Sequence, residues 1–180
     1  YCAIVGLPCT VTVPASTPQA KVKQTLAYGA EVRLIEGERS KARDAAMADA
    51  ADGAFYAGHA NSPHFHHGVK TWAYEVVAQL EKAPSHIVLP YGAGSLVSGV
   101  LLGLRELLES QVISSMPVVH AVRKEASGPG NVPRIASGLD VSNPERDPHI
   151  RMDIADTGGS IAFVTDTEIL AAQAQLGTAG

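Results

Sequence analysis

Short runs of β-branched and apolar residues alternate with helix-forming stretches along this 180-residue chain. Two parallel strands can be joined only through a long crossover, which is usually a helix. The alternation therefore predicts an α/β fold in which helices cover a mostly parallel sheet. The expected strands are residues 11–13, 32–35, 54–56, 87–89, 116–122 and 160–164, and the expected helices are residues 19–28, 40–51, 70–80, 95–108 and 168–176.

Two local patterns add detail to these elements. The run 87–89 is wholly apolar, which is typical of a strand buried on both faces of a parallel sheet. Thr165 and Glu168 have the spacing of a capping box, so we expect the last helix to begin at this threonine.

Residues 57–68 are rich in Gly, His, Asn, Ser and Pro and carry no periodic apolar pattern. Such a stretch predicts a loop or a crossing between domains. We therefore expect one domain over residues 1–58 and a second over residues 59–180, each of them partial.

Charge and hydropathy exclude several classes of protein. Fourteen Lys and Arg against eighteen Asp and Glu give a net charge of −4, so there is no basic field for a nucleic acid. No apolar run approaches the ~20 residues that span a bilayer, which argues against a membrane protein. Cys2 and Cys9 match no metal-binding or redox spacing, and reduced thiols of a cytoplasmic protein are expected.

A glycine-rich turn follows the expected strand 87–89 and leads into a helix from Ser95. Small residues let the backbone approach an oxyanion, and the N–H groups at a helix start point toward it. The turn departs from the dinucleotide fingerprint at Val97, and from the Walker loop at Val100 and Leu101. Taken alone, it is either an anion site or a tight turn whose glycines allow close packing.

In its context, the turn resembles the phosphate-binding loop of fold-type II pyridoxal-phosphate enzymes, which include threonine synthase, cysteine synthase, serine dehydratase and the tryptophan synthase beta subunit. Further segments match that family in the same order, and their details are most similar to threonine synthase-like members. The resemblance implies a tryptophan synthase beta-like fold of three α/β/α layers, with a partial small domain followed by a partial large cofactor-binding domain. The matching segments are 11–14, 28–32, 61–75, 89–99, 135–139 and 158–168.

The resemblance also implies a cofactor site for pyridoxal 5'-phosphate. The hydroxyl of Ser95 would be an extra donor to the phosphate, Gly138 would lie near the pyridine ring, and Asn61 would line the substrate side. The backbone N–H groups implied to hold the phosphate are those of Gly92, Ala93, Gly94, Ser95 and Leu96.

In this family the Schiff-base lysine lies upstream of every segment matched here, so no catalytic residue is assigned and the chain is expected to be a catalytically silent fragment. The longer protein would be a lyase or synthase of amino-acid metabolism, working by β- or γ-elimination or replacement on an amino acid or its phosphate ester. Members of the family are commonly dimers, so a homodimer is expected. None of the six lysines stands in the catalytic context; they are Lys21, Lys23, Lys41, Lys70, Lys82 and Lys124.

Three other interpretations compete. The chain could be a stand-alone domain that binds a phosphorylated ligand or a partner subunit without catalysis. A serine hydrolase centred on Ser95 is disfavoured because both outer glycines of the nucleophile elbow are missing. A metal site at the histidine cluster is disfavoured because no Cys or acidic ligand stands near it. The histidines of this cluster are His59, His64, His66 and His67.

The remaining charged residues of interest are interpreted as surface charges or helix caps rather than as acid/base pairs. They are Lys70, Glu75, Asp147, Asp153 and Asp156.

Overall fold

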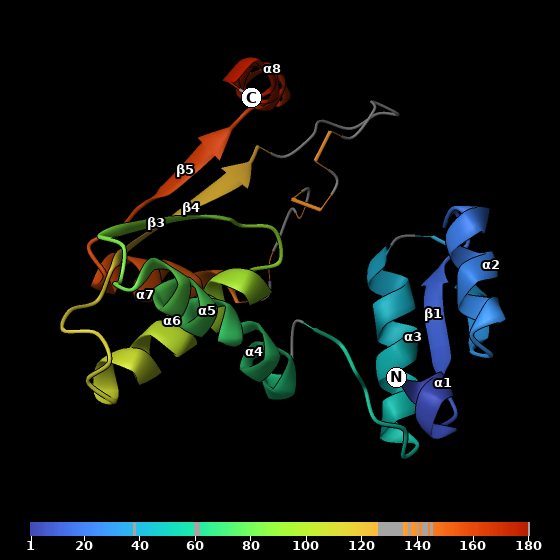
Figure 1. The fold of residues 1–180 in the computed structure, drawn as a ribbon. Helices are drawn as coiled ribbons and strands as arrows, with labels where there is room; N and C mark the ends of the chain where they lie inside the picture. The colour runs from blue at the N-terminus through green and yellow to red at the C-terminus, as the bar shows by residue number, and fades with distance from the viewer. Residues whose placement is uncertain are drawn as a thin grey trace. The chain divides into compact units, whose positions relative to one another are not determined.

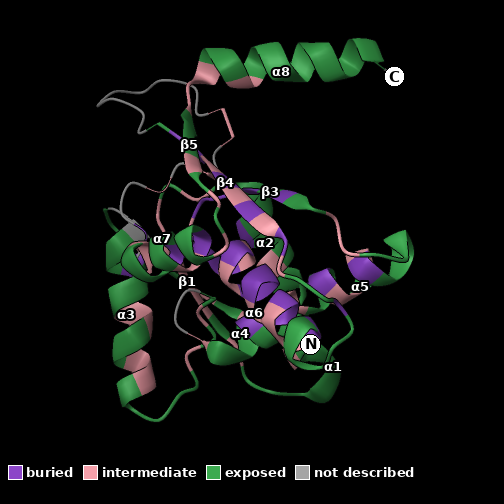
Figure 2. Cartoon of the chain, turned by 90° about the vertical axis from the view of Figure 1, so that its left-hand side faces the viewer, coloured by how far each residue is buried: buried purple, intermediate pink, exposed green. Residues whose placement is uncertain are grey.

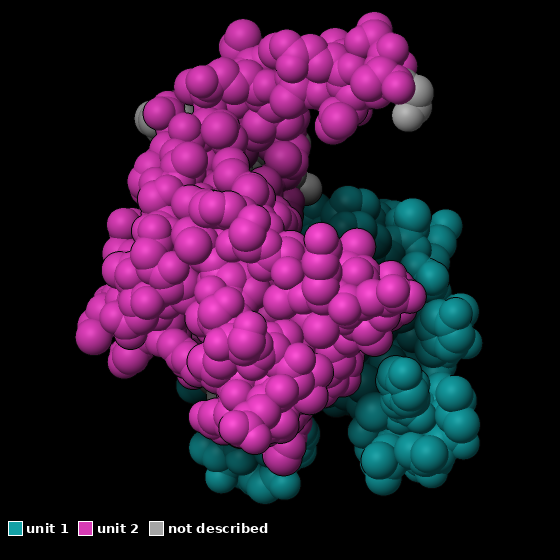
Figure 3. All heavy atoms as spheres, turned by 60° about the vertical axis from the view of Figure 1, so that its left-hand side comes forward, with its two compact units in different colours: residues 1–57 teal, residues 58–180 magenta. Residues whose placement is uncertain are grey.

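The computed structural model describes residues 1–37, 39–59, 62–125, 135–136, 138–139, 141, 144 and 146–179, the side chain of Arg39 aside (Figure 1). The chain divides into two compact units, Tyr1–Ala57 and Gly58–Gly180. Figure 3 colours these units separately. Each unit is described by itself.

Unit 1 is a two-stranded parallel sheet with its helices. Strands β1 and β2 pair from Thr10 opposite Glu31 to Pro14 opposite Ile35, with α2 as the crossover between them. Residues 54–56 form no strand, so the strand predicted there is wrong; within the described residues, no third strand adds to this sheet, and a strand needs a ladder partner. The elements are α1 (Cys2–Val5), β1 (Thr10–Pro14), α2 (Gln19–Ala27), β2 (Glu31–Ile35) and α3 (Arg39–Ala51).

Unit 2 contains a three-stranded parallel sheet in the order β3-β4-β5. Its strands pair with His86 opposite Val118 and with Ala121 opposite Ile161. Both sheets are parallel, which confirms the predicted α/β class. The elements are α4 (Pro63–Val69), α5 (Thr71–Leu80), β3 (His86–Pro90), α6 (Ser95–Glu109), β4 (Val118–Lys124), α7 (Asp147–Asp156), β5 (Ile161–Val164) and α8 (Asp166–Ala179).

Two helices of unit 2 were not predicted. Helix α4 lies inside the stretch assigned to a loop; Pro63 occupies its first turn, where the missing N–H of proline does no harm. Helix α7 has few apolar residues, but Ile150 and Ile154 are one turn apart and both are 1% exposed. Two buried apolar positions in ten residues are too few to give a recognisable amphipathic period.

The core of unit 2 lies between its sheet and helices α5, α6 and α7, which cover one face of the sheet (Figure 1). Buried residues concentrate along α6, as Figure 2 shows. Ile87 and Leu89 point into this core, whereas Val88 points to the other face and is 64% exposed. The prediction of a strand buried on both faces is therefore wrong, because in the part of the chain that the structure describes the helices pack against one side of this sheet.

The capping box at the start of α8 is confirmed. The N–H of Glu168 donates to Thr165 Oγ1 (3.2 Å), and the N–H of Thr165 donates to the Glu168 carboxylate (2.8 Å). The N–H and the hydroxyl of Thr165 both donate to the Glu168 carboxylate and hold its pKa below the ordinary value. Over the described ranges, no helix is both long and apolar enough to cross a membrane.

Candidate functional site

The glycine-rich turn lies at the carboxyl end of β3, between Pro90 and the first residue of α6. The N–H of Tyr91 donates to the carbonyl of Val122 on β4 (2.8 Å), so the sheet pairing continues up to the turn. Ligands of parallel α/β sheets gather at this edge. The strand, turn and helix thus stand in the order that the sequence predicted.

The backbone N–H groups of residues 92–96 are free to donate hydrogen bonds to a ligand. None of these groups has a hydrogen-bond acceptor in the described part of the chain, and the N-cap residue Gly94 provides no side-chain cap. Gly92, Gly94 and Ser95 are buried, so water reaches these donors poorly. A buried N–H without an acceptor costs about 1–3 kcal/mol. A phosphate group would satisfy these donors and would interact favourably with the positive end of the 15-residue helix α6.

Packing explains why two of the turn residues are glycines. Gly94 has a φ of 91°, and a Cβ atom there would lie 2.2 Å from Cδ1 of Ile150 on α7. A Cβ atom on Gly92 would lie 2.4 Å from the carbonyl oxygen of Gly138. The structure thus brings together two residues of the predicted cofactor site, Gly92 and Gly138. The predicted substrate residue Asn61 lies outside the described residues.

Ser95 and His59 form a pair that sequence reasoning missed. The Ser95 hydroxyl donates to the carbonyl of His59 (3.2 Å) and lies 3.0 Å from Nδ1 of the same residue. The resemblance implied that the Ser95 hydroxyl is an extra donor to the phosphate. In the structure this hydroxyl instead donates to the carbonyl of His59. The His59 ring packs against Phe65, with the ring centroids 5.6 Å apart. Ser95 and His59 are 36 positions apart in the sequence, so no local pattern could indicate this contact.

A serine and a histidine in contact also occur in hydrolases, but the third group is missing here. No carboxylate among the described residues contacts the His59 ring, and a triad needs one to orient the imidazole. His59 therefore stands beside the turn as a neighbour of Ser95. No group of three or more His, Cys, Asp or Glu residues suited to a metal ion occurs in the ranges that the structure describes.

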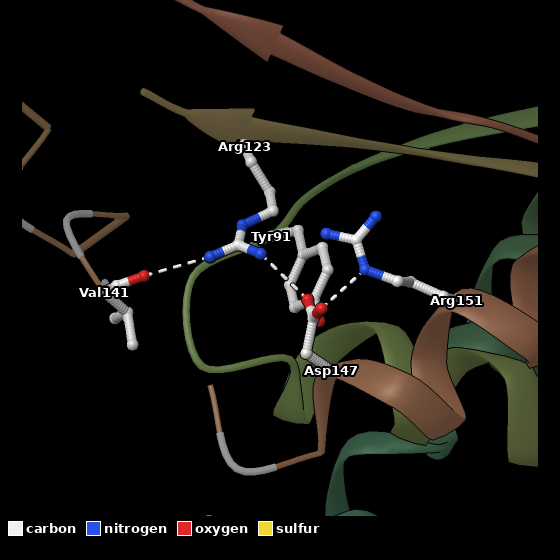
Figure 4. Close-up of polar contacts among 5 residues, drawn as sticks. All are labelled: Tyr91, Arg123, Val141, Asp147 and Arg151. Carbon is white, nitrogen blue, oxygen red and sulfur yellow. Dashed lines mark hydrogen bonds and ion pairs between the residues drawn. The ribbon is translucent and has the colours of Figure 1, made fainter. Parts of the chain in front are cut away.

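The first residue of the turn is anchored by a buried polar network (Figure 4). Tyr91 is fully buried, and its hydroxyl donates to Oδ1 of Asp147 on α7 (2.6 Å). Arg123 of β4 lies with its guanidinium 4.9 Å from the Tyr91 ring centre, 2.8 Å from the same Asp147 oxygen and 3.1 Å from the carbonyl of Val141. Arg151 donates to the second oxygen of Asp147 (2.5 Å). The network thus ties the turn to β4 and α7.

Burial and charge shift the titration of this network. Burial raises the pKa of Tyr91 well above its ordinary value, and its hydrogen bond to the Asp147 carboxylate adds to the rise. Burial also raises the pKa of Asp147, but the hydrogen bonds from Tyr91 and Arg151 outweigh it, so the net pKa lies below the ordinary value. Near neutral pH the network therefore combines a neutral tyrosine with an ionised aspartate.

Asp147 was assigned to the surface or to a helix cap; it lies in the first turn of α7, but its side chain is neither an exposed charge nor a cap. Its side chain is only 21% exposed, and it is the centre of the network around Tyr91. The start of α7 could have been predicted from the pair Asp147 and Pro148, because both residue types are typical of a first helical turn. The partners could not be predicted, because Tyr91 lies 56 residues earlier in the chain.

The other charged residues assigned to the surface behave differently from one another. Glu75 and Asp156 are exposed, as expected. Lys70 is instead paired with Glu106 of α6 (Nζ–Oε1 2.8 Å), and its side chain is 19% exposed. Asp153 is half-buried and is paired with an arginine of α6. These pairs join helices and are not arranged around the turn.

Known proteins resemble this chain along its whole length. The sequence profile of the "Pyridoxal-phosphate dependent enzyme" family matches residues 1–180. The threonine synthase of Methanosarcina acetivorans is 32% identical over 194 residues, which cover 98% of this chain and 48% of that protein. The L-threonine ammonia-lyase of Geobacter sulfurreducens is 36% identical over 104 residues, which cover 57% of this chain and 26% of that protein.

Solved structures show the same fold at lower identity. The structure of maize serine racemase matches with a TM-score of 0.73 and 19% identity, over 95% of this chain and 53% of that one. The chain spans about half the length of the curated threonine synthases it matches. Because the family profile matches residues 1–180, this chain belongs to the pyridoxal-phosphate dependent enzyme family.

Proposed function

We propose that this chain provides the phosphate-binding turn of a pyridoxal-phosphate-dependent lyase or synthase of amino-acid metabolism, similar to threonine synthase. The observation that carries the proposal is the run of backbone N–H groups over residues 92–96 without acceptors in the described structure. Relatives of this chain are named threonine synthase and L-threonine ammonia-lyase. The reaction class, a β- or γ-elimination or replacement on an amino acid or its phosphate ester, is the one that the family resemblance implies.

The residues of the chain would act by binding and by positioning. The N–H groups of residues 92–96 would hold the cofactor phosphate, and the start of α6 would stabilise its charge. His59 would fix Ser95 at the first turn of α6, and the Tyr91 network would fix the other end of the turn. When bound, pyridoxal phosphate supplies an electron sink for a carbanion next to the substrate's amino group.

Several parts of this proposal rest on the family resemblance. Gly138 would lie beside the cofactor ring, and Asn61 would line the substrate side. Unit 1 would be part of the small domain and unit 2 part of the large cofactor-binding domain. A homodimer in the cytoplasm, acting on an amino-acid substrate, completes the proposal.

The proposal includes catalytic silence of the 180-residue chain by itself. Lys70 is paired with Glu106, and Lys124 with Asp166, so two of its buried or half-buried lysines are already engaged in ion pairs. Incubation with pyridoxal phosphate followed by borohydride should label the lysines weakly and without preference. A single lysine labelled to full stoichiometry would show that the chain carries its own catalytic lysine.

The turn itself can be tested with a pair of variants at one position. Ala93→Asp places a carboxylate where the phosphate is expected, and Ala93→Asn adds nearly the same volume without the charge. Pyridoxal phosphate should raise the Tm of the wild type and of the Asn variant, and the Asp variant should lose this stabilisation. Pyridoxal without its phosphate should stabilise none of them. Equal stabilisation of the Asp and Asn variants would overturn the assignment.

A second candidate function is a stand-alone module that binds a phosphorylated ligand. It is favoured by the fact that all the N–H groups of the turn belong to this chain and to one unit of it. In that case inorganic phosphate should stabilise the chain as well as pyridoxal phosphate does, and Ala93→Asp should reduce the stabilisation by both ligands equally. A clear preference for pyridoxal phosphate favours the enzyme.

A further inference from the structure

A second polar pocket lies in unit 2, one helical turn beyond the glycine-rich turn, with Ser98 of α6 among its lining residues. It is lined by α4, α6 and α7, and its volume is about 270 Å³. The side chains that matter here are those of His66, His67, Arg105, Arg146, His149 and Asp153. None of the turn residues 92–96 is among its lining residues. A volume this small suits a small ligand rather than a nucleotide.

The positive charge of this pocket is only partly compensated. Arg105 is paired with Asp153, and these two charges cancel. Arg146 has no carboxylate partner among the residues that the structure describes; its contact there is the ring of His66. Nη1 of Arg146 lies 3.0 Å from one ring nitrogen and 3.1 Å from the other. At most one of these nitrogens has a lone pair to accept with, so the ring accepts at most one hydrogen bond from the guanidinium.

The partner of Arg146 is itself neutral. His66 is 5% exposed. Burial lowers its pKa, and the nearby Arg146 charge lowers it further. A neutral, buried imidazole cannot compensate a guanidinium. The half-buried Arg146 therefore retains a net positive charge at the pocket wall, with donors to spare.

We propose that this pocket binds a small tetrahedral oxyanion of the phosphate class, with Arg146 as its principal ligand. A guanidinium fork matches two oxygens of such an anion, which explains why an arginine occupies this position. The exposed imidazoles of His67 and His149 stand at the same pocket and can donate further hydrogen bonds. The site is separate from the cofactor phosphate and does not depend on the function proposed above.

Histidine ring signals in NMR spectra provide a local readout. The chain has seven histidines, and three of them line the pocket. Addition of inorganic phosphate should shift the signals of His66, His67 and His149 until saturation. His86 and His120 stack on each other along β3 and β4, with ring centroids 5.4 Å apart, and neither lines the pocket. Their signals should stay in place and serve as an internal control.

Variants separate this site from the turn. Arg146→Gln should weaken phosphate binding by about tenfold or more, as expected for the loss of a charge-assisted hydrogen bond. Arg146→Lys keeps the charge and should retain part of the affinity. Lys82→Gln removes the same charge from an exposed turn and should bind like the wild type. Ala93→Asp, which blocks the turn, should leave the shifts at the pocket unchanged.

The outcomes are distinct. Equal affinity in the wild type and in a folded Arg146→Gln variant would overturn the proposal, as would linear shifts that never saturate. Loss of the shifts in Ala93→Asp would assign them to the turn and would also overturn it. Tighter binding of glycerol 3-phosphate than of inorganic phosphate would identify an organic phosphate as the ligand. The reverse order would identify the free ion.

Discussion

The two units of this chain have the same kind of parallel sheet but very different cores. Among the described residues of unit 2, fifteen buried apolar and aromatic residues form one cluster around α6. In unit 1, the described residues include only two buried apolar side chains, Val22 and Ala42. Apolar side chains that would form a core are instead exposed there, among them Leu26 (52%) and Leu34 (48%).

The comparison explains where the site is. A turn can hold its N–H groups toward an anion only if the strand before it and the helix after it are fixed. In unit 2 both are fixed by the core, and the Tyr91 network adds polar anchors. A two-stranded sheet with two buried side chains has little apolar burial to stabilise it. The difference in packing can be tested with matched changes in the two units.

The largest effect is expected from the core of α6. Leu101 is fully buried, so Leu101→Ala should lower the free energy of unfolding by about 2.7–5 kcal/mol. Leu26→Ala in unit 1 removes the same atoms from an exposed side chain and should change it by less than about 0.5 kcal/mol. Urea unfolding, followed by the fluorescence of Trp72 and by circular dichroism, measures both. Equal losses in the two variants would contradict the account.

The next largest loss of stability is expected from replacing a glycine of the turn, compared with a glycine of unit 1. Gly94 and Gly29 both have positive φ angles, but an added Cβ meets Ile150 at the first and nothing within 4 Å at the second. Gly29→Ala should cost about 1–2 kcal/mol from the backbone alone. Gly94→Ala should cost about 1–3 kcal/mol more, because it also overpacks the core. The unfolding midpoints of the two variants show whether packing or backbone strain accounts for most of the destabilisation at Gly94.

Two aspartates, one in each unit, allow the stability contributions of a half-buried and an exposed ion pair to be compared. Asp147→Asn should cost about 1–3 kcal/mol, because Tyr91 and Arg123 would lose a buried charged partner. Asp49 pairs with Arg33 on the surface of unit 1, with side chains 37% and 42% exposed. Asp49→Asn should cost only about 0–1 kcal/mol. If the surface pair proved as strong as the buried one, the distinction between the units would fail.

The lowered pKa of Asp147 also sets a pH dependence. A carboxyl group whose pKa is lower in the folded than in the unfolded state stabilises the fold above its unfolded pKa, and this contribution is lost as the pH falls through the folded pKa. The wild type should therefore lose stability below about pH 4. Asp147→Asn should lose less over the same range. Parallel pH profiles of the two proteins would refute the role of this carboxylate.

The smallest effect concerns a helix cap. Thr165→Ala should destabilise the start of α8 by about 0.5–2 kcal/mol, since the capping box would lose its acceptor. Thr25 in α2 donates to the carbonyl of Lys21 within its own helix and caps nothing. Thr25→Ala should therefore leave α2 nearly unchanged. Hydrogen exchange of the amides in both helices measures the contrast.

Sequence reasoning predicted what depends on local pattern. Five of the six predicted strands, the capping box at Thr165 and the turn after residue 90 follow from neighbouring residues. The exposed Val88 was mispredicted because apolar content does not reveal which faces of a sheet are covered. Helix α7 was missed because its two buried isoleucines lie among polar residues.

The site was predicted in part for the same reason. The small residues of the turn mark a close backbone approach, and this signal is local. The contacts from Asp147 to Tyr91 and from His59 to Ser95 join residues 56 and 36 positions apart. Only the fold brings such residues together, so no spacing in the sequence could indicate them.

The central claim is that the backbone N–H groups of residues 92–96 bind the cofactor phosphate. Backbone amide NMR spectra of the ¹⁵N-labelled chain, recorded while pyridoxal phosphate is added, test it most directly. The account predicts saturable downfield shifts of these amides in the wild type and in Ala93→Asn, and none in Ala93→Asp. Saturable shifts confined to the Arg146 pocket, with the turn amides unmoved, would contradict it.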